Sequence, residues 1–283
     1  MTRADRTVLS PGDPPAFTVR RGTSRRFFVV CDHASVAMPL SLGTLGVGAA
    51  DLSTHIACDI GARWVAERVA TSLDATLICA GFSRLVVDCN RYPWDAGSMA
   101  RQSAGVVIPG NADLTEDERL GRLDEIFLPY QQAIDRGLED LQAAGHAPIF
   151  LSIHSCTAQL HGPPRPWPIG IGYVGSAAYS MRVIDELRRL GVAPVGDNEP
   201  YAMEPGADYT TPEHALRRGL EYLQVEFRQD LIGTESAAHG WAETFVAALK
   251  ASLAGDRPAP ERWTPRYACP HRTAIGPAQL TAP

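Results

Sequence analysis

Residues 27–33 read Phe-Phe-Val-Val-Cys-Asp-His, an unbroken apolar run that ends in two polar residues. A continuous apolar run is typical of a strand that helices cover on both faces, since neither face then meets water. A second run, residues 149–153, ends in the same way at His154. The two runs predict a buried, mostly parallel sheet, with His33 and His154 at the carboxyl ends of two of its strands.

Apolar residues recur at strand or helical spacing on both sides of these runs. Further strands are expected over residues 75–79, 85–89, 169–174 and 222–227, and helices over residues 55–73, 116–143, 177–190 and 236–253. Strands that alternate with helices predict an α/β fold, in which helices cover both faces of the sheet. We expect one domain over residues 25–255, an irregular lead-in over 1–24 and an extended Pro-rich tail over 256–283.

Composition and charge argue against several classes of protein. The net charge of −6 disfavours a nucleic-acid partner, because a phosphate backbone is held by clustered Lys and Arg. The six cysteines form no Cys-x-x-Cys pair, so neither a zinc ribbon nor a thioredoxin-type site is indicated. The chain has no apolar run long enough to cross a membrane and no apolar signal segment. We expect a cytoplasmic protein that acts on a small molecule, and a homo-oligomer is compatible with the sequence.

Polar side chains gather where four of the expected strands end, and ligands of α/β proteins bind at the carboxyl ends of parallel strands. The residues at these ends are Asp32 and His33, Asp88 to Arg91, His154 and Ser155, and Glu226 to Asp230. Two histidines and a carboxylate can hold zinc, and an arginine can hold a substrate carboxylate. Each residue also has a purely structural interpretation: Asp88 could pair with Arg84 or Arg91, and Glu226 could face solvent.

A further pair, His55 and Asp59, lies four residues apart at the start of the helix expected over residues 55–73. Residues at this spacing share one face of a helix. If that face points towards His33, Asp59 supplies an anionic metal ligand. The alternative is that the helix dipole alone accounts for a carboxylate in the first turns of a helix.

The chain resembles the N-formylglutamate amidohydrolase family in eight motifs that occur in order along almost the whole domain. They are residues 31–35 (Cys-Asp-His-Ala-Ser), 55–62, 83–91 (Ser-Arg-Leu-Val-Val-Asp-Cys-Asn-Arg), 108–111, 152–155 (Ser-Ile-His-Ser), 165–167, 197–201 (Asp-Asn-Glu-Pro-Tyr) and 226–231 (Glu-Phe-Arg-Gln-Asp-Leu). The resemblance implies a fold similar to that of zinc carboxypeptidases, with three α/β/α layers around a mixed sheet. It also implies metal-dependent hydrolysis of an N-acyl group, typically formyl, from an acidic amino acid such as glutamate.

The resemblance further implies a metal site that holds zinc or another divalent cation. His33 and His154 correspond to the two histidine ligands of zinc carboxypeptidases. The glutamate ligand of that pattern would stand at position 36, which here is Val36. Asp59 is our choice for the missing ligand, with His55 in reserve.

Roles for the remaining candidates follow from the same resemblance. Glu226 is expected to act as general base, and Arg228 or Arg84 to stabilise the oxyanion. The residues expected to bind the substrate are Asn90, Arg91, Asn198, Glu199 and Tyr201. Positions 156 and 168 depart from the family pattern, so the acyl group or the amino acid that this protein accepts is left open.

Two other functions remain open at this stage. Cys156 lies two residues after His154, an arrangement that would suit a cysteine amidase if the two side chains met. A non-catalytic protein that holds an acidic metabolite in the same crevice would need the fold and the arginines, but not Glu226.

Overall fold

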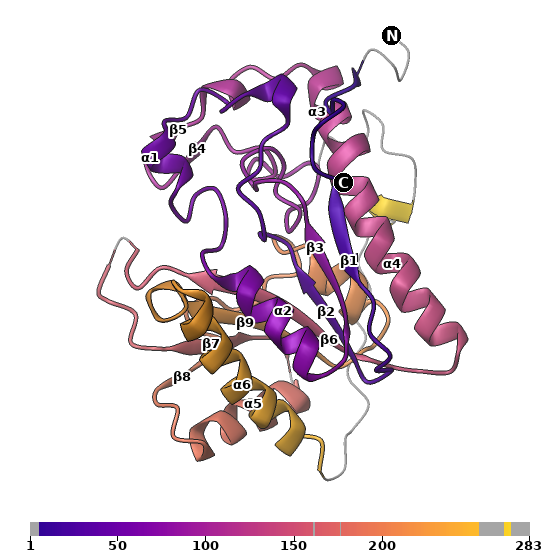
Figure 1. Ribbon diagram of the computed structural model, residues 1–283, viewed down its shortest axis with the longest axis vertical. Helices are drawn as coiled ribbons and strands as arrows, with labels where there is room; N and C mark the ends of the chain where they lie inside the picture. The colour runs from indigo at the N-terminus through magenta and orange to yellow at the C-terminus, as the bar shows by residue number, and fades with distance from the viewer. Residues whose placement is uncertain (1–5, 161, 176, 255–268, 273–283) are drawn as a thin grey trace.

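A seven-stranded sheet forms the centre of the computed structural model, which describes residues 6–160, 162–175, 177–254 and 269–272 (Figure 1). Its strand order is β1-β3-β2-β6-β9-β7-β8. The strands are β1 Phe17–Arg20, β3 Thr76–Ala80, β2 Phe27–Cys31, β6 Ile149–Cys156, β9 Tyr222–Arg228, β7 Ile169–Gly172 and β8 Val195–Asp197. Neighbours pair in parallel except β1 with β3 and β7 with β9. The sheet is therefore mixed and mostly parallel, as predicted.

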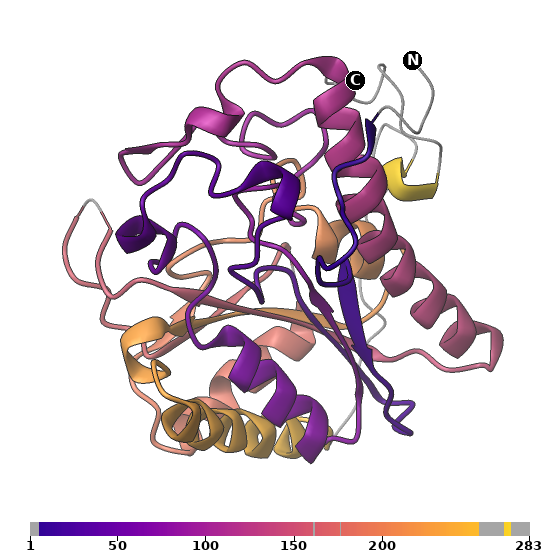
Figure 2. The same ribbon diagram turned by 45° about the horizontal axis from the view of Figure 1, so that its top comes forward.

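Helices pack on both faces of this sheet (Figures 1 and 2). On one face, side chains of β2, β6 and β9 are buried against three helices. These helices are α2 (Ala62–Ser72), α5 (Ala178–Arg189) and α6 (Glu235–Ala251). The other face packs against α4 (Leu128–Ala143), which continues from α3 (Glu116–Arg122) through a π-helical turn. The three-layer α/β/α prediction is thus confirmed. Among the described residues, no helix is long and apolar enough to cross a membrane.

Short elements complete the chain between these layers. The helical ones are η2 Leu40–Leu42, α1 Ala49–Leu52, η3 Pro109–Asn111, the π-helices η4 Leu123–Phe127 and η5 Pro212–Leu216, η6 Gln229–Leu231 and η7 Pro270–Arg272. A small hairpin pairs β4 (Gln102–Ser103) with β5 (Val106–Val107).

The prediction of a strand over residues 85–89 is wrong, because these residues form turns and irregular backbone. Leu85, Val86 and Val87 are fully buried, but in a separate core that α3 and the segments around residues 45–57 and 92–108 share. The backbone there bonds within turns, and the Asp88 N–H donates to the carbonyl oxygen of Ser98 at 2.7 Å. An apolar run reports burial, and here the burial is achieved without a sheet partner.

The helix predicted over residues 55–73 begins only at Ala62, so His55 and Asp59 do not share a helix face. Residues 53–61 form turns instead, and the Asp59 N–H donates to the carbonyl oxygen of His33 at 3.0 Å. Gly61 follows with φ +78° and precedes the first residue of α2. This reversal ties Asp59 to the end of β2 before the helix starts.

Gly61→Ala is expected to destabilise the fold. A β-carbon at this position would lie 2.2 Å from the carbonyl oxygen of Ile232, and the left-handed backbone adds strain to any L-residue. We expect a loss of about 2 kcal/mol or more, seen as a lower Tm in thermal denaturation. Gly240→Ala is the matched control: it lies inside α6 with open space around the new methyl group, and should raise stability by about 0.5–1 kcal/mol. Equal Tm values for the two variants would contradict this account of Gly61.

The two ends of the chain also depart from expectation where they are described. The lead-in expected to be irregular contains β1, which pairs with β3 and adds an antiparallel edge strand. Most of the tail expected over residues 256–283 lies outside the described residues. Its described part, residues 269–272, is not extended: it forms η7 beside α4, with Cys269 and His271 buried.

Candidate metal centre and active site

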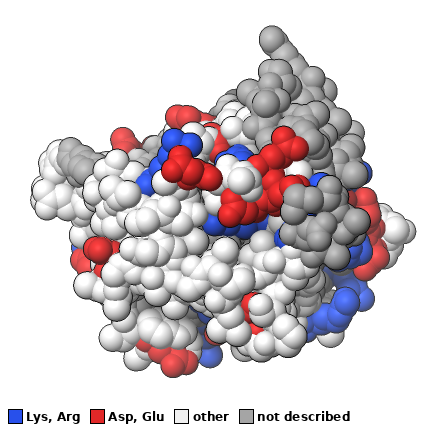
Figure 3. Space-filling view, turned by 90° about the horizontal axis from the view of Figure 1, so that it is seen from above, with Lys and Arg blue, Asp and Glu red and all other residues white. Residues whose placement is uncertain are grey.

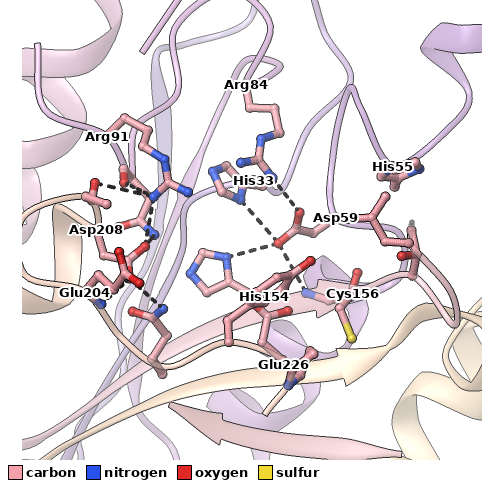
Figure 4. Close-up of a pocket in the computed structure, with 18 of the residues that line it drawn as sticks. His33, His55, Asp59, Arg84, Arg91, His154, Cys156, Glu204, Asp208 and Glu226 are labelled. Carbon is pink, nitrogen blue, oxygen red and sulfur yellow. Dashed lines mark hydrogen bonds and ion pairs between the residues drawn. The ribbon is translucent and has the colours of Figure 1, made fainter. Parts of the chain in front are cut away.

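His33, Asp59 and His154 meet above the carboxyl ends of β2 and β6 (Figure 4). The Nδ1 atoms of His33 and His154 lie 3.3 Å and 3.0 Å from the same carboxylate oxygen, Oδ2 of Asp59. All three side chains are buried, and their ligand atoms lie within 4.8 Å of one another. His154 stands inside β6, two residues before its end, where the register pairs it with Glu226 of β9.

A second carboxylate stands behind each histidine. Nε2 of His33 lies 2.7 Å from Oδ1 of Asp88, and Nε2 of His154 lies 3.2 Å from Oδ2 of Asp32. Such a partner holds the proton on Nε2 and leaves the Nδ1 lone pair free, which is the arrangement that metal-binding histidines commonly have. Both Nδ1 atoms point towards Asp59, so the tautomers suit a shared cation.

The charges around the two imidazoles also suit a divalent cation. Asp32, Asp59 and Asp88 converge on them, and among the described residues Arg84 is the arginine that forms ion pairs with this group, through Asp59 and Asp88. Burial by itself would lower the pKa of His154, but Asp32 and Asp59 raise it well above its usual value. The excess of buried negative charge favours a positive charge between the histidines, and zinc is typically held by such a His and carboxylate set.

The geometry distinguishes the two candidates, Asp59 and His55, for the ligand that position 36 does not supply. Val36 is 54% exposed and takes no part in the triad. Asp59 lies between the two histidines, whereas His55 lines the adjoining pocket but is not one of the three clustered ligands. Of the two candidates that the sequence left open, Asp59 is the one brought into contact with both histidines.

Glu226 lies beside this triad on the neighbouring strand β9. Its Oε2 atom is buried and has no hydrogen-bond partner among the described residues. Burial raises the pKa of Glu226 to about 7, with Asp59 acting in the same direction. An ionisable oxygen without a partner, with a pKa near neutrality, has the properties of a general base.

A pocket of about 490 Å³ opens onto the triad and Glu226. Its walls include Arg84, Asn90, Arg91, Cys156, Thr157, Leu160, Tyr201, Glu204, Asp208 and Gln224. The lining thus contains both acidic and basic side chains. Seen from above, the molecular surface likewise shows acidic side chains beside a hollow in which basic side chains are visible (Figure 3).

Asn90 and Arg91 line the pocket, but each is already bound to the segment 207–210. Arg91 donates from Nη1 to Oδ1 of Asp208 at 2.8 Å. Asn90 accepts the backbone N–H groups of Tyr209 and Thr210 at its Oδ1 atom. Asn90 therefore positions this wall of the pocket. Arg91 makes its hydrogen bonds to the described residues through Nη1, which leaves Nε and Nη2 for a ligand.

Three other sequence-based candidates do not reach the pocket that the described residues line. The proposed oxyanion role of Arg228 is corrected, because its guanidinium binds Asp230 and the carbonyl oxygen of Arg165. Asn198 accepts the Tyr173 N–H at its side-chain oxygen and so shapes a turn after β8. Glu199 is exposed. Tyr201, from the same motif, does line the pocket.

The cysteine amidase alternative is not supported by the geometry. Both ring nitrogens of His154 are directed to Asp59, Asp32 and Ser152 rather than to the thiol. Burial raises the pKa of Cys156 to about 12, which keeps the thiol protonated at neutral pH.

Sequence reasoning missed several residues of the site. Asp32 was visible next to His33, but its role depends on contact with His154. Asp208 and Glu204, which line the pocket, lie in a segment without periodicity. The local pattern that marks Asp32 is a polar residue directly after an apolar run. Asp208 and Glu204 have no such pattern around them.

A second buried group, Asp135, His214 and His271, also brings ligand atoms within 4.8 Å. Its carboxylate already accepts from the guanidinium groups of Arg218 and Arg272, and His271 lies 3.2 Å from it. The cluster is therefore balanced by positive charge, and we interpret it as the anchor that holds residues 269–272 against α4.

Comparison with known proteins gives a family match and similar solved structures. Residues 25–233 match the sequence model of a family described as N-formylglutamate amidohydrolase. The chain is similar to gene product Atu2144 from Agrobacterium tumefaciens, with 32% identity, a TM-score of 0.82, and coverage of 87% of this chain and 98% of that one. It shares the fold of the N-formylglutamate amidohydrolase from Ralstonia eutropha JMP134, with 19% identity, a TM-score of 0.61, and coverage of 84% and 97%. No curated protein matches the chain.

Proposed function

Because the chain belongs to the N-formylglutamate amidohydrolase family, whose members are hydrolases that act on amide bonds, we propose that it hydrolyses the amide bond of an N-acyl acidic amino acid such as N-formyl-L-glutamate. The observation that carries this proposal is the buried, unpartnered Oε2 atom of Glu226 beside the His33–Asp59–His154 triad. A base and a set of metal ligands then face the same pocket. Metal-dependent amide hydrolysis uses both, whereas a binding protein needs neither.

We assign His33, Asp59 and His154 as the residues that would hold zinc or another divalent cation. Such a cation would polarise the amide carbonyl and lower the pKa of a water molecule. Asp32 and Asp88 would orient the two histidines and raise their basicity.

Glu226 would accept the proton of the attacking water and deliver it to the leaving nitrogen. Arg84, which lines the pocket beside Asp59, would stabilise the oxyanion that develops on the carbonyl oxygen. Arg91 would bind the carboxylate of the amino acid through Nε and Nη2, where a planar fork is favoured over a point charge. Asp208 fixes the orientation of that fork.

The decisive experiment is turnover of N-formyl-L-glutamate by the purified, zinc-loaded protein, with formate and glutamate both quantified. We expect both products in equal amounts, and expect N-formyl-L-leucine to be a poorer substrate because it lacks the second carboxylate. Calorimetric binding of N-formyl-L-glutamate without release of formate would instead identify a non-catalytic binding protein.

Two further proposals concern the place of the protein in the cell and the bounds of its domain. We place the protein in the cytoplasm and in amino-acid catabolism, in line with six cysteines that are all free thiols. The domain bounds of 25–255 also stay a prediction, and limited proteolysis would test them.

A further inference from the structure

The pocket extends to both sides of the triad. Arg91, Asp208 and Glu204 lie on one side of it, and His55 and Cys156 lie on the other (Figure 4). If the scissile amide sits at the triad, the amine part of the substrate occupies one side and the acyl part occupies the other. With Arg91 holding the amino acid, the acyl side is the one where Cys156 lies, and the pocket-lining Thr157 follows Cys156 in the chain. A formyl group would leave that side empty.

Three arginines stand at or beside this pocket, and their charges are not equally balanced. Arg84 pairs with Asp59 and Asp88, and Arg91 pairs with Asp208. Arg165 has no carboxylate partner among the described residues: its guanidinium donates to the Thr157 carbonyl and hydroxyl oxygens and to the Tyr201 hydroxyl. Arg165 therefore brings an uncompensated positive charge to the acyl side.

These contacts also hold Arg165 in a defined orientation. Nη2 donates to the Tyr201 hydroxyl at 2.6 Å, and the guanidinium carbon stands 4.7 Å from the centre of the Tyr201 ring. Its backbone N–H donates to Ala158, and its carbonyl oxygen accepts from Arg228. Thr157 and Tyr201 both line the pocket, so the charge is held at the pocket wall.

The charge of Arg165 also acts on His55, which lies on the Cys156 side of the triad. Burial lowers the pKa of His55, and the charges of Arg84 and Arg165 add to this effect. Cys156 and Leu160 also line the pocket and offer apolar surface to methylene groups.

We propose that Arg165, together with the Tyr201 hydroxyl, binds a carboxylate at the far end of the acyl group, so that the preferred substrates are N-acyl amino acids with a dicarboxylic acyl chain. This inference rests on the proposed function. N-succinyl-L-glutamate and N-glutaryl-L-glutamate represent the class. An uncompensated arginine gains most from an anionic group, and the fork of its N–H donors fits a carboxylate.

The test compares kcat/KM for N-formyl-, N-succinyl- and N-glutaryl-L-glutamate with that for the uncharged analogues N-butyryl- and N-valeryl-L-glutamate. For at least one chain length, we expect the anionic acyl group to exceed its uncharged analogue by roughly 10- to 100-fold, as for a charge-assisted hydrogen bond. Equal rates for charged and uncharged acyl groups would overturn the inference.

Variants separate the two arginines. Arg165→Gln should abolish the preference for the anionic acyl group, and Arg165→Lys should keep part of it. Arg91→Gln should lower kcat/KM for all five substrates alike, because they share the glutamate moiety. Arg189→Gln, an exposed change on α5, is the matched control and should alter none of them. If Arg165→Gln lowered all five rates by the same factor, Arg165 would not be reading the acyl group.

The results distinguish a failure of this inference from a failure of the proposed function. If N-formyl-L-glutamate is hydrolysed but no anionic acyl group is preferred, only this inference is wrong. If the zinc-loaded protein hydrolyses none of the five compounds, the proposed function is wrong and this inference with it.

Discussion

Glu226→Gln is expected to lower kcat for N-formyl-L-glutamate by roughly 10²- to 10⁴-fold, the usual contribution of a positioned general base. Glutamine has nearly the same shape as glutamate but cannot accept the proton of the attacking water. The Oε2 atom makes no hydrogen bond with the described residues, so the substitution breaks no contact seen there. Zinc content and Tm should therefore stay close to those of the unmodified protein.

The matched control is Glu235→Gln, an equally conservative change at an exposed residue at the start of α6. It should leave kcat unchanged. Full activity in Glu226→Gln would remove Glu226 from the base role, whereas loss of zinc in that variant would point to a part in metal binding.

The pH dependence of kcat/KM tests the same role from another side. Burial raises the pKa of Glu226 to about 7, so without a cation the carboxylate becomes protonated as the pH falls through neutrality. A base acts only when ionised, so activity should fall on the acid side. A bound divalent cation favours the ionised form, so the limb of the zinc-loaded protein should lie below pH 7. The residual activity of Glu226→Gln should lack this limb.

Removal of the metal is the second change expected to have a very large effect. Chelation should abolish turnover, and added zinc should restore it. Chelation should also lower Tm, because a ligand that binds only the folded state stabilises it by mass action. The excess negative charge around His33 and His154 would then lose its counter-charge. An absence of bound metal on elemental analysis, with unchanged turnover under chelator, would refute the metal-dependent mechanism.

Substitution of the ligands should reproduce the effect of chelation. His154→Ala is expected to lower activity by more than roughly 100-fold, since even the outer partners of metal ligands contribute about 10- to 100-fold. His239→Ala, a partly exposed histidine on α6, is the control. Asp59→Ala and His55→Ala separate the two candidates for the third ligand: zinc should be lost from the first and retained by the second. The opposite result would assign the site to His55.

The sheet and the two histidines were within reach of sequence reasoning, because they depend on local pattern. The apolar runs at residues 27–31 and 149–153 bury both faces of β2 and β6, and the parallel order then brings His33 and His154 to one edge. Helices α4, α5 and α6 follow from periodicity for the same reason. Burial of a repeating face requires no knowledge of the partner.

An apolar pattern predicts which residues are buried, but it does not fix their backbone conformation. Residues 85–87 are as apolar as a strand, yet they fold as turns in a core of their own. The predicted start of the helix at residue 55 failed because Gly61 adopts a left-handed conformation that the apolar spacing around it does not reveal.

What the sequence by itself determined is the α/β architecture, the placement of His33 and His154, and a set of motifs that names the family. Only the tertiary structure decided that Asp59 joins these histidines, that Asp32 and Asp88 stand behind them, and that Arg165 pairs with no carboxylate among the described residues. The physical reason is distance along the chain. Apolar periodicity is visible among residues that are close in the sequence. The partner of a charged side chain, by contrast, depends on contacts between segments tens of residues apart.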